Sequence, residues 1–271
     1  MTTKNDQLDK LVEAVLASSK YKDVSRDLIK SIGLQELGKR SSIKEAIKAT
    51  KNKLHQVGGA YLSGNEVYSK WLDSLAKISR SSNQDELLKY LVKIMSYHAS
   101  TRERLPILSQ FYTTILADLP PIHRVLDVAC GFNPLALPWM PLTDPVEYYM
   151  CDIYGNMINF LNKFMTLMHV QGCGMVCDVI HSCPSEKVDV AFILKTIPCL
   201  EQIDKLVGFR LLHAINADYM VISFPVHSLG GRSKGMMTNY EAKFYTMVEN
   251  TTWSVRQFEF STELAFLVKK I

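Results

Sequence analysis

Residues 125–140, with the sequence VLDVACGFNPLALPWM, constrain the fold of this chain more than any other segment. Two apolar residues lead into Asp127, a turn of small residues follows at Ala129, Cys130 and Gly131, and a stretch rich in helix formers comes next. This order predicts a strand, a tight turn and a helix. Small residues let a ligand approach the backbone closely, and a helix start offers free N–H groups, so the turn is a candidate nucleotide site.

Asp152 strengthens this interpretation, because it ends the segment YYMCD, where a second parallel strand should finish. A carboxylate in that place can accept hydrogen bonds from both hydroxyls of a ribose. A buried strand and helix without a ligand is the alternative that the turn alone leaves open. A dinucleotide site requires G-x-G-x-x-G, but those three places hold Ala129, Gly131 and Pro134. The D-x-A-x-G pattern is similar instead to the cofactor loop of methyltransferases that use S-adenosylmethionine (SAM), which carries no phosphate.

Seven strand-like segments follow residue 119, and the earlier ones alternate with intervals long enough for helices. They cover residues 125–128, 148–152, 175–178, 188–194, 219–224, 255–260 and 264–269. The last two are close enough to form a hairpin, which adds an antiparallel strand at the edge of an otherwise parallel sheet. We therefore expect an α/β fold with a Rossmann-like methyltransferase sheet.

Apolar residues recur at helical spacing through the first 119 residues. The expected helices cover residues 6–19, 26–33, 43–57, 67–78, 87–95 with a continuation towards 104, and 111–115. Gly33 is expected to end the second helix, and Gly58 with Gly59 the third. The dipeptide Pro120-Pro121 marks the best boundary, because consecutive prolines end a helix. We predict an all-helical domain over 1–119 and a SAM-binding domain over 120–271.

The net charge of +4 is unevenly spread along the chain. Residues 1–60 contain ten Lys and two Arg against seven Asp or Glu, which gives +5 in this segment. Such an excess favours an acidic partner such as nucleic acid, although a solvated helix face is the competing explanation. The candidate RNA-binding lysines on the third helix are Lys44, Lys48, Lys51 and Lys53.

Several protein classes do not fit the sequence. The polar segment MTTKNDQLDK is not a secretory signal, and no apolar run is long enough to cross a bilayer. We therefore expect a cytoplasmic protein that does not associate with a membrane. The six cysteines form no C-x-x-C pair, which argues against a zinc ribbon or other metal site and against a disulfide framework. Free and mostly buried thiols are expected.

Two charged residues lie at the carboxyl ends of predicted strands, at the edge where open α/β sheets bind ligands. Asp178 ends the third strand. If Asp152 holds the ribose, Asp178 lies close to where the adenine amino group would be. Its alternative role is to cap a helix. Lys195 follows the fourth strand within K-T-I-P, where methyltransferases of exocyclic amines commonly have N/D-P-P-Y. The absence of that motif argues against an exocyclic amine as the methyl acceptor, although Lys195 as a merely solvated residue remains the alternative.

A ring nitrogen such as N7 of guanine suits this sequence better as an acceptor. It presents an in-plane lone pair and needs no general base, so positioning and charge complementarity suffice. A Lys or Arg that donates to the neighbouring O6 would orient the base. The basic loop SLGGRSKGM at 228–236 is suited to a phosphate backbone or is simply a solvated loop. An Arg of HASTRER at 98–104 could bind a carboxylate, either that of Asp127 or that of SAM.

Six segments together resemble the aminoglycoside-resistance 16S rRNA (guanine(1405)-N(7))-methyltransferases. They are LHQVGGAY, HASTRERLP, DVACGFNPLALPWM, LKTIPCLE, ISFPVHSLGGRSKGM and STEL, which agree with the family in sequence and in order. The resemblance implies methyl transfer from SAM to N7 of a guanine in the decoding site of 16S rRNA, within the assembled 30S subunit. We expect the protein to act as a monomer.

The resemblance also implies roles for individual residues. Positions expected to surround SAM are Tyr61, His98, Ala99, Ser100, Arg104, Ala129, Gly131, Asp152, Ile153, Asp178, Val179 and Leu194. Among these, Arg104 is expected at the carboxylate of SAM, and Ile153 offers the adenine only apolar packing. Lys195 and Glu201 are the expected catalytic residues. Target engagement or an intact site is expected to involve Arg232, Lys234, Met236 and Glu263.

Three functions remain open on the sequence: an rRNA N7-guanine methyltransferase, a SAM enzyme acting on a small molecule, and a catalytically silent RNA-binding module. A small-molecule enzyme would use its accessory region as a lid and has no need of a segment with a charge of +5. A silent module would not need Asp152, Asp178 and Arg104 together. The sequence therefore favours the first function.

Overall fold

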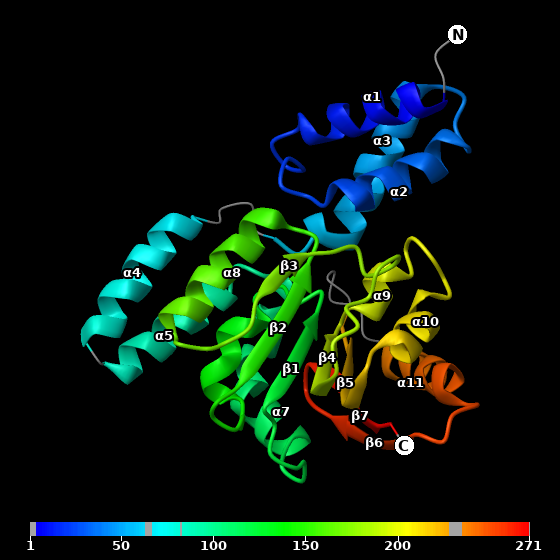
Figure 1. Ribbon diagram of the computed structural model, residues 1–271. Helices are drawn as coiled ribbons and strands as arrows, with labels where there is room; N and C mark the ends of the chain where they lie inside the picture. Colours follow the sequence, from blue (N-terminus) through cyan, green and yellow to red (C-terminus); the bar gives the residue numbers. More distant parts are fainter. Residues whose placement is uncertain (1–3, 63–66, 82, 228–234, 271) are drawn as a thin grey trace.

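A seven-stranded sheet forms the centre of the protein in the computed structural model, which describes residues 4–62, 67–81, 83–227 and 235–270 (Figure 1). In spatial order its strands are β3 (Gly174–Val176), β2 (Glu147–Asp152), β1 (Arg124–Val128), β4 (Val188–Leu194), β5 (Ala217–Pro225), β7 (Glu263–Lys269) and β6 (Ser254–Glu259). The strands from β3 to β5 pair in parallel, whereas β7 pairs antiparallel with both β5 and β6. The predicted α/β fold and its C-terminal hairpin are confirmed, with β7 one place inside the edge formed by β6.

Helices cover both faces of this sheet, which explains why β4 is an almost continuous apolar run. Side chains of alternate residues enter two separate cores, so Phe192 belongs to one and Ile193 to the other. The first core contains α7 (Leu108–Ile115) and α8 (Gly155–Leu167). The second contains α9 (Ile197–Leu200), α10 (Val207–Ala214) and α11 (Met236–Val248). The sheet is therefore packed on both of its faces.

The helices of the first 119 residues lie in two groups (Figure 1). The first group, here called the N-terminal lobe, consists of residues 4–59 and contains α1 (Lys4–Leu16), α2 (Arg26–Leu37), α3 (Ile43–Leu54) and a π-helix (His55–Gly59). The second group contains α4 (Tyr68–Ser81), α5 (Gln84–Met95), α6 (Ala99–Arg104), a 3-10 turn (Leu105–Ile107) and α7. In the second group α4 packs on α8, while α5 and α7 pack on the segment that follows β1.

The N-terminal lobe is joined to the carboxyl edge of the sheet by direct backbone contacts. Val24 forms an antiparallel bridge with Tyr154, and the N–H of Ser25 donates to the carbonyl of Ile153 over 2.7 Å. The N–H of Gly155 in turn donates to the carbonyl of Asp23 over 2.7 Å. The lobe is therefore anchored directly beside the end of β2.

Two predicted helix ends and one predicted helix type are wrong. Helix α2 continues through Gly33 to Leu37, because this glycine serves close packing: an added Cβ would lie 2.6 Å from Leu11 Cδ2. Helix α1 ends at Leu16 instead of residue 19. The expected helix after β1 is a 3-10 helix (Asn133–Trp139) with Pro138 inside it, because a proline has no N–H to continue an α-helical ladder.

No helix among the described residues is long and apolar enough to cross a membrane. Within the same ranges, no three His, Cys, Asp or Glu side chains are grouped as they would be around a metal ion. The six cysteines are free thiols, as expected, but only Cys130 and Cys151 are buried and Cys173 is exposed. The thiols are thus less buried than the sequence analysis predicted.

Candidate active site

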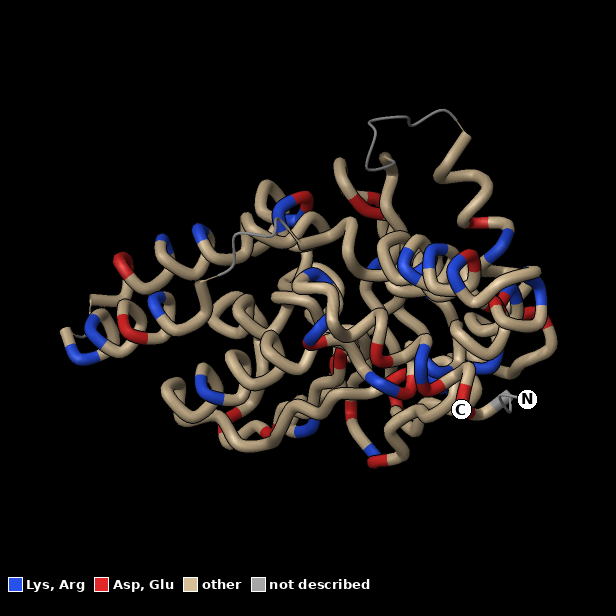
Figure 2. Tube along the Cα trace, turned by 90° about the horizontal axis from the view of Figure 1, so that it is seen from above, with Lys and Arg blue, Asp and Glu red and all other residues tan. Residues whose placement is uncertain are grey.

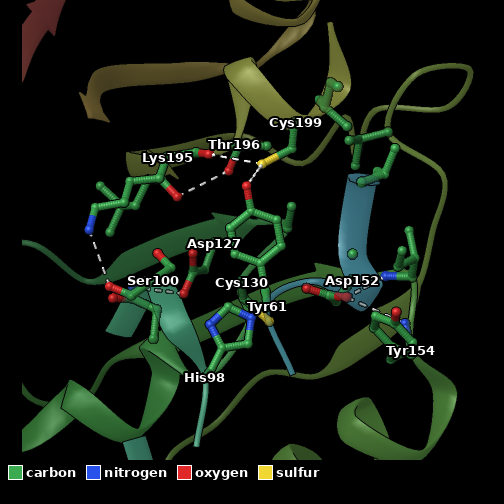
Figure 3. Close-up of a pocket in the computed structure, with 18 of the residues that line it drawn as sticks. Tyr61, His98, Ser100, Asp127, Cys130, Asp152, Tyr154, Lys195, Thr196 and Cys199 are labelled. Carbon is green, nitrogen blue, oxygen red and sulfur yellow. Dashed lines mark hydrogen bonds between the residues drawn. The ribbon is translucent and has the colours of Figure 1, made fainter. Parts of the chain in front are cut away.

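A cavity of about 840 Å³ lies at the carboxyl ends of β1, β2 and β4, beneath the N-terminal lobe (Figure 3). The predicted cofactor residues that line it are Tyr61, His98, Ser100, Arg104, Ala129, Asp152, Ile153, Asp178, Val179 and Leu194, and Lys195 lines it as well. Parallel strands that end at one edge bring these residues together from segments far apart in the sequence. We call this space the first cavity.

Ala99 and Gly131 do not line the first cavity but shape its wall. The N–H of Ala99 donates to the carbonyl of Tyr61 over 2.8 Å. Gly131 has a φ of +51°, and a Cβ there would lie 2.7 Å from the ring of His98. Glycine is therefore required at the turn both for its backbone conformation and for its close approach to His98.

Asp152 is fixed at the end of β2 by three backbone N–H groups. Its Oδ2 accepts from Gly131 over 3.0 Å, and its Oδ1 accepts from Ile153 over 2.7 Å and from Tyr154 over 3.3 Å. Burial raises the pKa of Asp152, while the three N–H groups oppose that shift. The carboxylate is thus held in one orientation on the cavity wall, where oxygen lone pairs suit hydroxyl donors.

Asp178 lies two residues beyond β3 on the same cavity. Its Oδ1 accepts from the N–H of Ile180 over 3.1 Å, and its Oδ2 lies 2.8 Å from Nδ1 of His181. The other ring nitrogen of His181 lies 3.2 Å from the hydroxyl of Ser31 on α2. His181, which no sequence pattern singled out, thus connects a cavity carboxylate to the N-terminal lobe.

Arg104 and Lys195 share a buried carboxylate, Glu263, that begins β7. Nε of Arg104 lies 2.8 Å from Oε1 of Glu263, and Nζ of Lys195 lies 3.2 Å from the same oxygen. Burial alone would raise the pKa of Glu263, but the two cations hold it below its usual value. Arg104 also donates to Oδ1 of Asn133 over 2.9 Å. Of the two carboxylates considered from the sequence, Asp127 is not bound by an arginine of α6.

Asp127 instead accepts hydrogen bonds from two neutral groups. Its Oδ2 lies 2.9 Å from Nδ2 of Asn133 and 2.7 Å from the hydroxyl of Tyr148. Burial raises its pKa to about 7, because these two bonds compensate only part of the lost hydration. The first cavity therefore contains a carboxyl group that can change its charge near neutral pH.

His98 and Tyr61 form the neutral part of the wall, with their rings stacked at a centroid distance of 6.0 Å. Burial, with smaller contributions from Arg104 and Lys195, lowers the pKa of His98 to about 3. Burial also raises the pKa of Tyr61 and raises that of Cys199, the latter to about 11. These three groups are uncharged at neutral pH, so none is a ready base or thiolate nucleophile.

Lys195 is buried rather than solvated, and its backbone adopts a φ of +58° at the end of β4. Its ammonium lies 2.8 Å from Oε2 of Glu103 and 3.3 Å from the carbonyl of Ser100, in addition to Glu263. Figure 3 shows its side chain extending towards Ser100. The interpretation of Lys195 as a surface residue is therefore wrong.

A second cavity of about 1150 Å³ adjoins the first and shares Tyr61, Lys195 and Cys199 with it. The predicted target residue Met236 lines this second cavity, together with Glu103 and others. Arg232 and Lys234 lie outside the described residues. Glu201, the other predicted catalytic residue, is not among the described residues that line either cavity; it is buried and forms an ion pair with Lys243 of α11.

The four predicted RNA-binding lysines of α3 differ in their surroundings. Lys44 and Lys48 are exposed and Lys51 is half-buried. Lys53 lies 3.2 Å from Oε1 of Glu36, which is buried in α2. Figure 2 looks down on the N-terminal lobe and marks its basic positions in blue. Lys53 thus has a partner within the fold, whereas the other three are open to an external one.

Some residues that line the first cavity were not named from the sequence. Leu28, Val57 and Gly58 of the N-terminal lobe line the first cavity, and so does Thr101. No local pattern distinguishes Leu28, Val57 and Gly58 from ordinary core residues, because only the docking of the lobe brings them there. Asn133 is different, since it stands within the segment 125–140 and could have been recognised as a polar residue in a predicted apolar helix.

The first cavity suits SAM in its chemistry. Its apolar walls can enclose an adenine, its carboxylates can bind ribose hydroxyls, an amino group or an ammonium, and its guanidinium can bind a carboxylate. The described wall has no glycine-rich turn shaped for a diphosphate. The residues present therefore fit the cofactor expected from the sequence.

Comparison with known proteins agrees with this fit. The family model described as "Ribosomal RNA methyltransferase (FmrO)" matches residues 17–267. Curated 16S rRNA (guanine(1405)-N(7))-methyltransferases of Micromonospora rosea and Micromonospora echinospora are 32% and 33% identical, covering 99% and 100% of both chains. A crystal structure of the 16S rRNA methyltransferase RmtF in complex with S-adenosyl-L-homocysteine has a TM-score of 0.86 at 29% identity, covering 99% of this chain and 100% of that one. The chain therefore belongs to the FmrO family of ribosomal RNA methyltransferases, as its sequence motifs predicted.

Proposed function

We propose that this protein transfers a methyl group from SAM to N7 of guanine 1405 of 16S rRNA, within the assembled 30S subunit. The observation that carries the proposal is the junction of the two cavities at Tyr61, Lys195 and Cys199. The first cavity fits the cofactor, and the second opens beside it with space for a base extruded from the RNA. Curated relatives over the full length of the chain act on this nucleotide.

The cofactor is held by residues of the first cavity in this proposal. Asp152 binds the ribose hydroxyls, Asp178 binds the adenine amino group, and Arg104 binds the carboxylate. Leu28 of α2 and Val179, which follows β3, together enclose the adenine. When bound, the cofactor supplies an electrophilic methyl group.

The protein residues at the junction position the acceptor and need not remove a proton. N7 of guanine carries a lone pair and no hydrogen, so its attack on a methyl group requires no general base. This requirement agrees with the neutral state of His98, Tyr61 and Cys199. Rate enhancement is then expected from orientation and exclusion of water rather than from acid–base chemistry.

The first 119 residues dock the enzyme on the subunit in this proposal, and residues 120–271 bind the cofactor. Exposed lysines on α3 contact rRNA phosphates, with Arg232, Lys234 and Met236 engaging the target region. The excess of basic residues over acidic ones in residues 1–60 supports this assignment. The enzyme acts as a monomer in the cytoplasm, and methylation of the decoding site gives resistance to aminoglycosides.

Incubation of the protein with radiolabelled SAM and purified 30S subunits tests the proposal. Strand scission specific for N7-methylguanine should map the label to position 1405. Label at another nucleotide, or in a small molecule with none in rRNA, would contradict the proposed target. A protein that binds subunits without transferring label would be the silent module considered from the sequence.

A further inference from the structure

We propose that Glu103 determines base specificity by accepting hydrogen bonds from the Watson–Crick edge of the target guanine. This inference rests on the proposed function and names the group that recognises its substrate. Glu103 belongs to α6 and lies on the second cavity but not on the first. It is the only acidic side chain among the described residues that line the second cavity.

The ion pair between Glu103 and Lys195 has one buried and one accessible member. The side chain of Lys195 is 4% exposed, whereas that of Glu103 is 30% exposed. Oε2 of Glu103 lies 2.8 Å from the ammonium, and Oε1 has no hydrogen-bond partner within the described parts of the chain. The carboxylate therefore presents its free oxygen on the side of the pair that solvent, and hence a ligand, can reach.

Lys195 is already saturated by acceptors of the protein. Its three N–H groups face the carbonyl of Ser100 and the carboxylates of Glu103 and Glu263. A substrate atom can bind this ammonium only by displacing one of the three. Its main effect is then to orient Glu103, and it can donate to O6 of a seated base only in exchange for one of these three acceptors.

The donor pattern of guanine matches this arrangement. Its N1–H and N2–H groups are adjacent donors that one carboxylate can accept together, in the way that it accepts two N–H groups of an arginine. The neighbouring O6 is an acceptor, on the side where a cation is favourable. N7 lies on the other edge of the base, so recognition by Glu103 leaves the methyl acceptor unobstructed.

Adenine has the opposite pattern at the same positions. Its N1 is an acceptor and would face a carboxylate oxygen, while its 6-amino group is a donor and would face the ammonium of Lys195. Adenine also has an N7, so the reactive atom alone cannot exclude it. A site built to bond an N–H group rejects a base that lacks it, because the buried polar groups are left unpaired.

The variant Glu103→Gln tests the inference, because it keeps the shape of the side chain but replaces one acceptor oxygen by a donor. Methyl transfer is measured on 30S subunits reconstituted with either guanine or adenine at the target position. We expect the rate on guanine at subsaturating subunit to fall about 10- to 100-fold, since one charged acceptor is removed. The ratio of guanine to adenine methylation should fall as well, while calorimetry gives a wild-type affinity for SAM.

Two further variants control this experiment. Glu103→Asp keeps the charge and should regain selectivity for guanine in part. Glu147→Gln makes the same chemical change in a partly exposed ion pair with Arg124 at the opposite edge of the sheet, and should leave the rate and the selectivity unchanged. Thermal unfolding of all three variants checks that each is folded.

Three results would overturn the inference. A folded Glu103→Gln protein with wild-type rate and selectivity would show that Glu103 does not contact the base. An equal fall in SAM affinity and rate would assign Glu103 to the cofactor cavity instead. Wild-type protein that transfers no label to guanine 1405 would refute the proposed function itself, which distinguishes that failure from the other two.

Discussion

Arg104 and Glu263 stand 159 residues apart in the sequence and form an ion pair in which both side chains are at least 99% buried. The pair joins the end of α6 to the start of β7, and Lys195 at the end of β4 contacts the same carboxylate. Two cations and one anion thus meet in a site with almost no water-exposed surface. Helix α6 and the hairpin of β6 and β7 are therefore held together at Arg104, which lines the first cavity.

Glu263→Ala is expected to destabilise the protein strongly. Removing one partner of a buried ion pair costs roughly 3–5 kcal/mol, because the remaining charge stays buried without compensation. Here the guanidinium of Arg104 and the ammonium of Lys195 would both be deprived of that partner. Urea unfolding followed by circular dichroism measures the free energy of unfolding.

A matched control is Asp118→Ala, which breaks an exposed pair with Arg256. Exposed pairs contribute little to stability, so this variant should unfold at nearly the wild-type urea concentration. Equal midpoints for Glu263→Ala and Asp118→Ala would contradict a structural role of the buried pair.

Asp152→Asn should weaken SAM binding while the fold survives. The asparagine amide keeps one acceptor oxygen for the backbone but presents an amino group in place of the other oxygen. Hydrogen bonds to a charged acceptor contribute about 1.5–3 kcal/mol each, so the loss of one predicts a roughly 10- to 100-fold higher Kd. Calorimetry gives the Kd, and wild-type affinity in a folded variant would remove Asp152 from the cofactor site. Asn is preferable to Ala here, because Ala would leave three backbone N–H groups unbonded.

The sequence predicted the sheet well because strands such as β4 and β7 are short apolar runs, while β6 alternates between more and less exposed residues. Local patterns wrongly predicted that α2 ends at Gly33, because this glycine packs against Leu11 of another helix. They also predicted an α-helix after β1, where Pro138 stands inside a 3-10 helix. Motif comparison located the cavity residues that follow strands. It could not locate Leu28 or the contact of His181 with Ser31, because these depend on how the N-terminal lobe docks.

SAM affinity should rise with pH around neutrality because of Asp127. Burial raises the pKa of this carboxyl to about 7, so its contribution to the stability of the free protein is present below about pH 4 and is lost as pH rises through 7. A cationic ligand in the first cavity favours the ionised form, and binding near pH 6 should therefore release a proton.

Calorimetry in two buffers of different ionisation enthalpy measures that proton. Asp127→Asn should bind SAM with a smaller proton release and with an affinity that depends less on pH between pH 6 and 7. His98 does not interfere, because its pKa of about 3 lies below this range. The same proton release in the variant would show that another group is responsible.

His181→Ala should reduce SAM affinity although His181 is absent from the cavity wall. Its Nδ1 lies 2.8 Å from Oδ2 of Asp178, and its Nε2 lies 3.2 Å from Oγ of Ser31. Without this ring, the carboxylate of Asp178 has one partner fewer. The N-terminal lobe also loses one hydrogen bond to the segment that follows β3. Ser31→Ala removes only the second interaction and should have a smaller effect on the Kd, so equal effects of the two variants would argue against orientation of Asp178 by His181.

Lys53 must be separated from the other lysines of α3 before docking can be tested. Its ammonium and the guanidinium of Arg40 hold the pKa of the buried Glu36 below its usual value, although burial opposes them. Lys53→Ala therefore leaves Glu36 with one cation fewer. This variant should lower the free energy of unfolding, an effect that could be mistaken for weaker binding of the subunit.

The triple variant Lys44→Ala, Lys48→Ala, Lys51→Ala isolates the electrostatic contribution of α3 to docking. Binding of 30S subunits is measured across a salt series. Each replaced lysine that neutralises an rRNA phosphate should reduce the slope of log affinity against log salt concentration by roughly 0.7–0.9. SAM affinity and the unfolding midpoint should stay at wild-type values, because none of these three side chains lines the first cavity. If the lysines only solvate the helix, the slope will not change. That result would remove α3 from the docking surface and leave the methyltransferase assignment intact, since the cavities that support it contain none of the three lysines.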